Sequence, residues 1–230
     1  MFSKPILRFL FVMAMPLMMM ACDKEKAKEN GEIMIVNASP GLANLAISVD
    51  GAPFGSGTLS YPGNTSYRTL VEGSHVLKAA QSGTNLFEGS LSTIANARQS
   101  LYLYDRSTQL KAFAVVDNIT LPPSGKAMLR FFNLSPNSPV VDAGVFVGAA
   151  FTPIFSGRPF EDNTTAFNNS SFQTVDAGTF KFQLRVNGAA VILSEIPSLV
   201  LESGKSYTIF AKGISGDTDS PLGLEVISNN

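Results

Sequence analysis

The chain has 230 residues, of which 45% are hydrophobic and 15% are charged, and its formal net charge is −1. This length fits one large domain or two small ones, and the hydrophobic fraction excludes a wholly disordered protein. The charge balance has no basic footprint for nucleic acid. One Cys excludes an internal disulfide framework and a thiolate zinc site, and one His leaves little for acid–base catalysis. We therefore expect no nucleic-acid partner and no cofactor.

The first residues predict an export signal. Lys4 and Arg8 precede an unbroken apolar run from Phe9 to Met20. As a helix this run rises only about 18 Å, which is too short for the roughly 30 Å hydrocarbon core of a membrane. Residues 1–21 are therefore predicted to be a signal peptide and not a spanning helix.

The end of this run, Ala21-Cys22, resembles the lipobox of bacterial lipoproteins, although Met19 stands where that family usually has Leu. The resemblance implies that Cys22 becomes the first mature residue and carries lipid. It also implies a bacterial cell-envelope protein, expected at the outer membrane with the leaflet left open. An ordinary signal peptide that contains a Cys is the alternative. The charged residues up to Gly31 have no apolar face, so residues 22–31 are predicted to be the lipidated Cys and a tether.

The rest of the chain contains one pattern twice. Four blocks recur in the same order: 37–40 with 133–136 (both Asn-x-Ser-Pro), 51–54 with 148–151, 66–73 with 171–178, and 99–103 with 205–209. A tandem duplication with one insertion predicts such ordered blocks. The breaker-rich stretch 121–126 contains two Pro and one Gly, and it predicts a short stiff linker. The expected units are 32–120 and 127–230.

Each unit has the pattern of a β domain. Leu45, Ile47 and Val49 alternate with smaller or polar residues, and 180–186 alternates in the same way. Short strand-like runs are separated by Gly, Pro, Asn and Ser, and no capped helix is expected. The Asn and Ser of each Asn-x-Ser-Pro block can bond nearby backbone, so the first strand of each unit should end there. The predicted fold class is all-β, with two tandem immunoglobulin-like or transthyretin-like β-sandwiches.

The paired Asn-x-Ser-Pro blocks, the Gly-x-x-Phe turn and the Gly-Lys-x-Tyr strand resemble a family of bacterial envelope lipoproteins. Members of that family carry tandem β-sandwich domains of unknown function. The resemblance covers nearly all of residues 32–228 and implies no catalytic residues. In that family an Asp-Ala-Pro stretch often follows Ser-Pro, and neither repeat has that Asp here.

Candidate catalytic groups are few. His75 lies in an expected strand, and its counterpart in the second unit is Phe180, which favours a packing role. The carboxylate clusters 161–162 and 217–219 lie among turn residues, so they are expected to be solvated loop charges. A carboxylate-dependent hydrolase and a calcium site at 216–220 are the alternatives. We expect no catalytic residues and no metal site.

The insertion in the second unit, residues 152–169, is the candidate binding segment. Aromatic residues and Arg are common at binding hot spots, and loops on a rigid sandwich often carry function. Four side chains are the expected contacts: Phe155, Arg158, Phe160 and Phe167. The alternative is that these Phe side chains cover the end of the sandwich.

The sequence therefore predicts a non-enzymatic, lipid-anchored envelope protein with a binding or structural role. Its expected partners are the membrane, through lipid on Cys22, and an envelope protein or glycan. A surface glycan-binding or adhesive lipoprotein is the first alternative, and the carboxylate-dependent hydrolase is the second.

Overall fold

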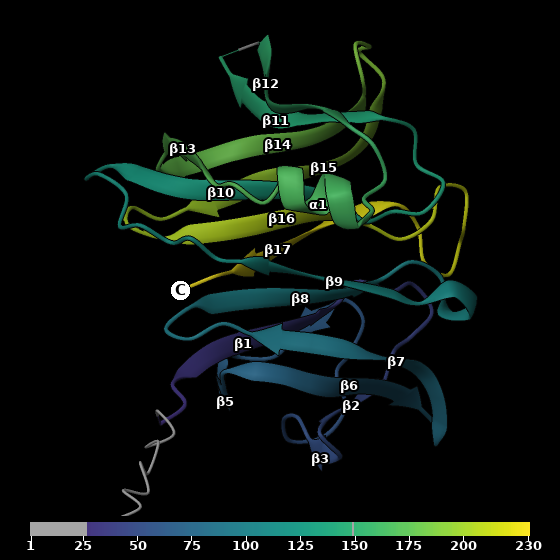
Figure 1. The fold of residues 1–230 in the computed structure, drawn as a ribbon. Helices are drawn as coiled ribbons and strands as arrows, with labels where there is room; N and C mark the ends of the chain where they lie inside the picture. Colours follow the sequence, from purple (N-terminus) through teal and green to yellow (C-terminus); the bar gives the residue numbers. More distant parts are fainter. Residues whose placement is uncertain (1–26, 149) are drawn as a thin grey trace, which may run out of the picture.

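The computed structural model describes residues 27–148 and 150–230, and nearly all its regular structure is β-strand (Figure 1). The all-β fold class is confirmed. The predicted signal peptide and Cys22 lie outside the described residues. Within the described part of the chain, no helix has the length and hydropathy needed to cross a membrane.

The first sandwich pairs two sheets. Its outer sheet has the order β3-β2-β6-β7, and its inner sheet has the order β4-β1-β8-β9, with β5 also paired to β1. The strands are β1 (Asn30–Asn37), β2 (Ala46–Val49), β3 (Ala52–Pro53), β4 (Gly63–Asn64), β5 (Arg68–Val71), β6 (Gly73–Gln81), β7 (Thr84–Thr93), β8 (Arg98–Tyr104) and β9 (Lys111–Val116), with the 3₁₀ turn η1 (Ser107–Gln109) before β9.

The second sandwich has the same plan. Its inner sheet has the order β13-β10-β16-β17, and its outer sheet has the order β12-β11-β14-β15. The elements are β10 (Lys126–Asn133), β11 (Val141–Val147), β12 (Ala150–Arg158), the helix α1 (Asn163–Asn168), β13 (Gln173–Asp176), β14 (Gly178–Val186), β15 (Ile192–Leu201), β16 (Ser206–Lys212) and β17 (Gly223–Ser228). In each sandwich the first strand runs parallel to a late strand, β1 to β8 and β10 to β16.

The Asn-x-Ser-Pro blocks end the first strand of each sandwich, as predicted. Asn37 accepts a hydrogen bond from the backbone N–H of Ser39, and Asn133 accepts one from that of Ser135. The Ser side chains reach further than expected. Ser39 Oγ donates to the carbonyl of Asp105 at 2.6 Å, and Ser135 Oγ donates to that of Gly213 at 2.7 Å. The motif therefore also fixes the chain just after β8 and after β16.

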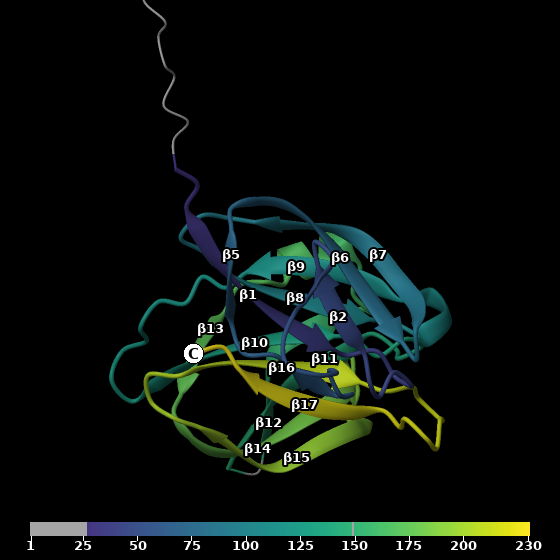
Figure 2. The ribbon, with the colours of Figure 1, turned by 90° about the horizontal axis from the view of Figure 1, so that it is seen from below.

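The four sheets stack as layers, with the two inner sheets packed against each other (Figures 1 and 2). Each sandwich has its own core, around Ile35 and Leu101 in the first and around Phe131 and Phe182 in the second. A third core lies between the sandwiches. Its members are Met34, Val36, Ala38, Tyr102, Tyr104, Phe113, Val115, Phe132, Leu134, Ala166, Phe210 and Ile227. The segment between β9 and β10 therefore joins two sandwiches that pack against each other.

A buried ion pair crosses this interface. Arg130 of β10 donates from Nη2 to Asp117 Oδ1 at 2.7 Å, and both side chains are fully buried. Arg130 also donates to Tyr102 Oη and Thr208 Oγ1, and Asp117 accepts from Ser100 Oγ at 2.6 Å. A buried ion pair is tolerated when its remaining donors and acceptors are bonded in this way. The network specifies how the two inner sheets align.

Two local expectations are wrong. A capped helix exists: α1 begins at Asn163, and its N-cap is Asp162, which accepts from the N–H groups of Thr164 and Thr165. The match of 51–54 with 148–151 also fails, because the β11–β12 hairpin of the second sandwich is longer. The register pairs Ser48 with Pro53 and Gly144 with Pro153. Gly51 follows Ser48 by three residues and Gly148 follows Gly144 by four, so the turn glycine stands one residue later in the second sandwich.

Candidate functional site

Two of the four predicted contact residues pack against the protein cores, Phe155 completely and Phe160 in part. Phe155 is 1% exposed and stacks on Phe131 with ring centroids 5.9 Å apart. Phe160 is half-buried against Tyr104, with centroids 5.7 Å apart. Their strand and loop pack onto the sandwich cores, so the covering role holds for both. Phe155 is not available to a partner, which corrects that expectation.

The other two residues differ in exposure. The Arg158 guanidinium lies 5.3 Å from the Phe155 ring centroid and is half-buried. Phe167, on α1, is 74% exposed. The four side chains do not converge on one surface, and the contact role of Phe167 stays a prediction.

The carboxylates of the two clusters serve local structure. Asp162 caps α1, and Glu161 is 1% exposed and accepts from Asn169 Nδ2 at 3.0 Å. Burial raises the pKa of the Glu161 carboxyl. Asp217 accepts from the N–H groups of Asp219 and Ser220 and so closes a turn. Among the described residues, no three His, Cys, Asp or Glu side chains gather as a metal site would require.

Both nitrogens of His75 have partners. Nδ1 lies 2.7 Å from Asp50 Oδ2, and Nε2 lies 2.7 Å from the carbonyl oxygen of Val71. The hydrogen bond to Asp50 raises the pKa of His75 and lowers that of Asp50. The ring is therefore held between two acceptors at the end of β6, which is a structural role.

The candidate site is a groove of about 740 Å³ between the two sandwiches. We call it the inter-sandwich groove. The first sandwich contributes Tyr61 and Pro62, and the second contributes Ser194 and Glu195 from β15 and Asp219 from the loop between β16 and β17. Lys212, at the end of β16, completes the polar wall and pairs with Glu225 at 3.1 Å. This places one aromatic ring among carboxylate, hydroxyl and ammonium groups.

Tyr61 remains a neutral phenol at ordinary pH. Burial raises its pKa to about 12, with Glu225 and Asp217 adding to the rise and a backbone hydrogen bond at Gly213 opposing it. Its hydroxyl can therefore donate as well as accept. The sequence offered only a weak sign of this residue, a Tyr-Pro pair within a turn-rich stretch, because the opposite wall comes from residues far along the chain.

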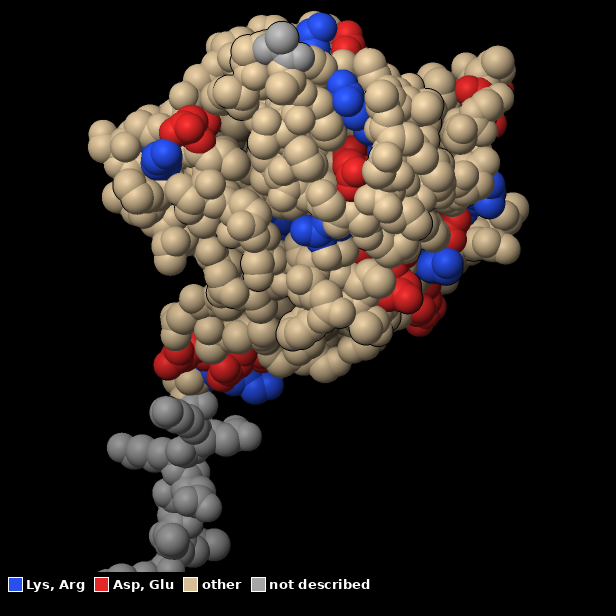
Figure 3. Space-filling model, turned by 90° about the horizontal axis from the view of Figure 1, so that it is seen from above, with Lys and Arg blue, Asp and Glu red and all other residues tan. Residues whose placement is uncertain are grey.

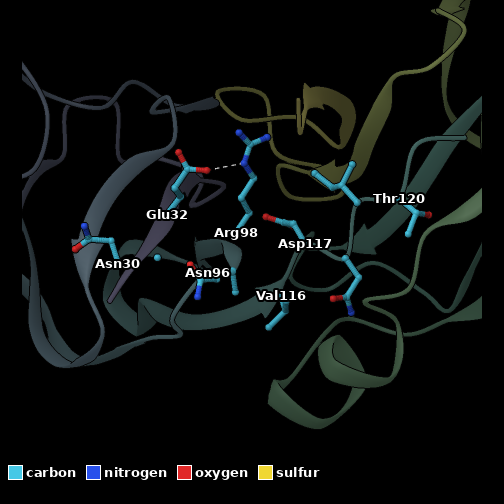
Figure 4. Close-up of a pocket in the computed structure, with 11 residues that line it drawn as sticks. Asn30, Glu32, Asn96, Arg98, Val116, Asp117 and Thr120 are labelled. Atoms are coloured by element: carbon cyan, nitrogen blue, oxygen red, sulfur yellow. Dashed lines mark hydrogen bonds and ion pairs between the residues drawn. The ribbon is translucent and has the colours of Figure 1, made fainter. Parts of the chain in front are cut away.

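A second cleft, of about 710 Å³, lies beside the start of β1 (Figure 4). Asn30, Asn96 and Thr120 line it together with the pair formed by Arg98 and Glu32, whose Nε and Oε2 atoms are 2.6 Å apart. Asp117 also lines the cleft and is paired with Arg130, so each charged group of this lining already has an ion-pair partner. The cleft also has no aromatic residue in its lining, which makes the inter-sandwich groove the better candidate.

The family comparison covers the first sandwich and continues past it. Residues 31–144 match the model of Domain of unknown function (DUF4397). The DUF4397 match begins at the second residue of β1 and ends within β11. It thus includes the interface strand β10 with Arg130 as well as the Tyr61 wall of the groove. The DUF4397 description assigns no activity.

Two further comparisons give little about a ligand. No curated protein matches the chain. Among solved structures, the CBM26 module CBMbc from Eubacterium rectale Amy13K, in complex with maltoheptaose, is 13% identical, with 86% of this chain and 97% of that chain covered and a TM-score of 0.26. A streptococcal virulence factor described by alpha-glucan binding is 11% identical, with the same coverage and a TM-score of 0.25. At these TM-scores, neither structure carries an argument about function, and the functional argument rests on the groove.

Proposed function

We propose that this protein is a non-catalytic, lipid-anchored binding protein of the bacterial cell envelope, and that the inter-sandwich groove binds a carbohydrate. The observation that carries the proposal is the groove lining. Tyr61 presents a half-buried ring, and Glu195 and Asp219 present exposed carboxylates in the same groove.

This lining suits the chemistry of a sugar. The apolar C–H face of a pyranose can pack on an aromatic ring, while side-chain acceptors and donors bond its hydroxyl groups. A few placed polar groups in a concave site supply orientation, and such sites occur preferentially at domain interfaces. Lys212 and Ser194 add donors beside the two carboxylates.

The groove is preformed. Its walls belong to different sandwiches, and the buried contact of Arg130 with Asp117 aligns those sandwiches before any ligand arrives. A site that does not have to be ordered on binding loses less conformational entropy. The ion pair therefore supports recognition of the ligand, although neither Arg130 nor Asp117 lines the groove.

The groove lacks the asymmetry that glycoside hydrolysis needs. Glycosidases set one carboxyl apart from the other by its environment, so that one is an acid and the other a base or nucleophile. Glu195 and Asp219 are both exposed, and Glu195 accepts a hydrogen bond from Gln183 at 2.8 Å. Binding without turnover is the function that this arrangement favours.

The orientation of the groove fits an anchored protein. Residues 27–30 leave the body at one end, and the β16–β17 loop that borders the groove lies at the opposite end (Figures 1 and 2). A lipid on Cys22 would hold the first end toward the membrane. The groove would then open away from it, where an envelope glycan could enter.

Affinity electrophoresis of the purified full chain tests the groove, with dextran, laminarin or polygalacturonate cast into a native gel. We expect at least one of these polysaccharides to retard the wild-type protein. Asp219→Ala and Tyr61→Leu should each weaken the apparent affinity by about tenfold, the usual effect of losing a charge-assisted hydrogen bond or a buried contact.

Asp176→Ala is the matched control, because it removes an exposed carboxylate that pairs with Lys126 and does not line the groove. It should bind as the wild type does. Circular dichroism shows whether Tyr61→Leu folds, and Asp219→Ala keeps the test informative if it does not. The proposal is overturned if no polysaccharide retards the protein, or if Asp219→Ala binds as tightly as Asp176→Ala.

A further inference from the structure

The outer sheets of the two sandwiches carry different side chains at equivalent positions. Strand register defines the equivalence: Ala46 pairs with Ala80 in the first sandwich, and Asp142 pairs with Arg185 in the second. Arg185 thus stands where the first sandwich has a small Ala. The longer β11–β12 hairpin of the second sandwich adds the cross-strand pair Phe146 and Phe151, beyond the point where the first sandwich turns.

These side chains form a compact cluster of cations and aromatic rings. The Arg185 guanidinium lies 4.1 Å from the Phe151 ring centroid and 5.3 Å from that of Phe146. Lys181 Nζ lies 5.8 Å from the Phe146 centroid. Lys181 and Arg185 point to the same side of β14 and are separated by about 13 Å along the strand. Figure 3 looks onto this side of the molecule, where a short column of charged side chains crosses a mostly uncharged surface.

The cluster is held rigidly and leads to the groove. Arg185 donates from Nε and Nη2 to Gln183 Oε1 at 2.9 and 2.8 Å, and Gln183 Nε2 donates to Glu195. Glu195 is also part of the groove lining. One chain of hydrogen-bonded side chains therefore runs from Arg185, which lies over the Phe151 ring, to the groove.

We propose that the ligand is an acidic polysaccharide, bound as an extended chain along a track from the inter-sandwich groove across the outer sheet of the second sandwich. This inference rests on the proposed carbohydrate-binding function and names its ligand class. Arg185 and Lys181 would bind carboxylate groups on separate sugar residues, and the Phe146 and Phe151 rings would contact the sugar faces between them. In the groove, the carboxylates of Glu195 and Asp219 would accept hydrogen bonds from sugar hydroxyl groups and not face the polymer's own carboxylates.

A polysaccharide fits this surface better than an acidic peptide. An extended peptide is recognised largely by main-chain hydrogen bonds along a free sheet edge. Lys181, Gln183 and Arg185 lie on β14, whose two edges are already paired with β11 and β15. The surface offers side chains and ring faces only, which are the groups that bond sugar hydroxyls and carboxylates.

The test compares polygalacturonate with the same polymer after methyl esterification, which removes the charge and keeps the backbone. With the full chain, we expect polygalacturonate to bind about tenfold more tightly than the esterified polymer at low salt, since charge-assisted bonds are the stronger ones. Added NaCl should narrow that difference. Arg185→Gln should abolish the preference for the charged polymer.

The matched control is Lys78→Gln, which removes one cation from the outer sheet of the first sandwich, at the position equivalent to Gln183. It should leave the preference unchanged. Equal affinity for the two polymers, or equal effects of Arg185→Gln and Lys78→Gln on the preference for the charged polymer, would overturn the proposal of an acidic ligand. If Asp219→Ala still weakens binding of dextran or laminarin in that case, the groove stands and only the acidic ligand class fails. Tighter binding of poly-L-glutamate than of polygalacturonate would also overturn the polysaccharide assignment.

Discussion

Arg130 and Asp117 form a 2.7 Å ion pair between the two sandwiches, and neither side chain is exposed. Asp117 directly follows β9, and Arg130 lies within β10. The pair therefore spans the connecting segment and closes the first sandwich onto the second. The apolar contact around Tyr102 and Phe132 surrounds it.

Breaking one side of this pair should destabilise the whole chain. Arg130→Met leaves Asp117 buried without its cation, and we expect a loss of about 3–5 kcal/mol in the free energy of unfolding. The double change Arg130→Met with Asp117→Asn should cost less than the sum of the single changes, since no unpaired charge remains. Urea unfolding followed by circular dichroism measures both. Additive effects, or two separate unfolding transitions in the wild type, would contradict the shared interface.

The His75–Asp50 contact should make stability depend on pH in a defined window. The pKa of His75 is raised above 6.5, so its contribution is complete below that value and is lost as pH rises through the folded pKa. The pKa of Asp50 is lowered below 3.8, so its contribution is present above that value and is lost as pH falls through the folded pKa. The wild type should therefore gain stability from this pair near pH 5 relative to pH 8.

His75→Phe provides the comparison, because Phe180 is the equivalent residue of the second sandwich. Urea titrations at both pH values should show a smaller difference between them for the variant than for the wild type. The same difference in both proteins would show that the contact contributes nothing to the pH dependence.

The buried Phe and the exposed Phe of the insertion should differ in how much their replacement by Ala destabilises the protein. Phe155→Ala removes a ring that is 1% exposed and stacked on Phe131, so we expect a loss of about 3–5 kcal/mol. Phe167→Ala removes a ring that is 74% exposed, and the change should stay within about 0.5 kcal/mol. Thermal unfolding separates the two. A large loss from Phe167→Ala would reveal a contact that this ring makes in the folded protein.

Lipidation at Cys22 is tested in cells. Wild-type protein should be processed and sediment with membranes, whereas Cys22→Ala should not mature in the same way and should leave the membrane fraction. Protease treatment of intact cells then separates the two orientations. Digestion places the groove outside the cell, and protection until the envelope is opened places it in the periplasm. Identical fractionation of the two proteins would exclude the lipid anchor.

Local chemistry predicted the all-β fold well. Alternation at Leu45, Ile47 and Val49 marks the face that enters the first core, and Asn37 and Asn133 end their strands by bonding the backbone two residues on. These features depend on neighbours in sequence. The short helix α1 escaped prediction because its cap, Asp162, supports only six residues.

The site could not be predicted in the same way. Tyr61 and Glu195 face one groove although they belong to different sandwiches and lie far apart in sequence, and no local pattern reports that they meet. The Phe residues of the insertion predicted a binding segment, yet an aromatic side chain can pack in a core as readily as it can bind a partner. Phe155 and Phe167 are the same residue type, and only their burial in the folded protein shows that the first is a core residue and the second is exposed.

The sequence by itself determined the all-β class and the buried face of outer strands such as β2, because period-two alternation and turn residues act locally. It did not determine β12, whose residues were expected to form a loop. Only the tertiary structure decided that the inner strands are buried on both faces. Their signal was present in the continuous apolar runs around Met34 and around Phe132, since such runs mark strands with no solvent face. What covers the second face is set by long-range packing, and that packing created both the Arg130–Asp117 pair and the groove.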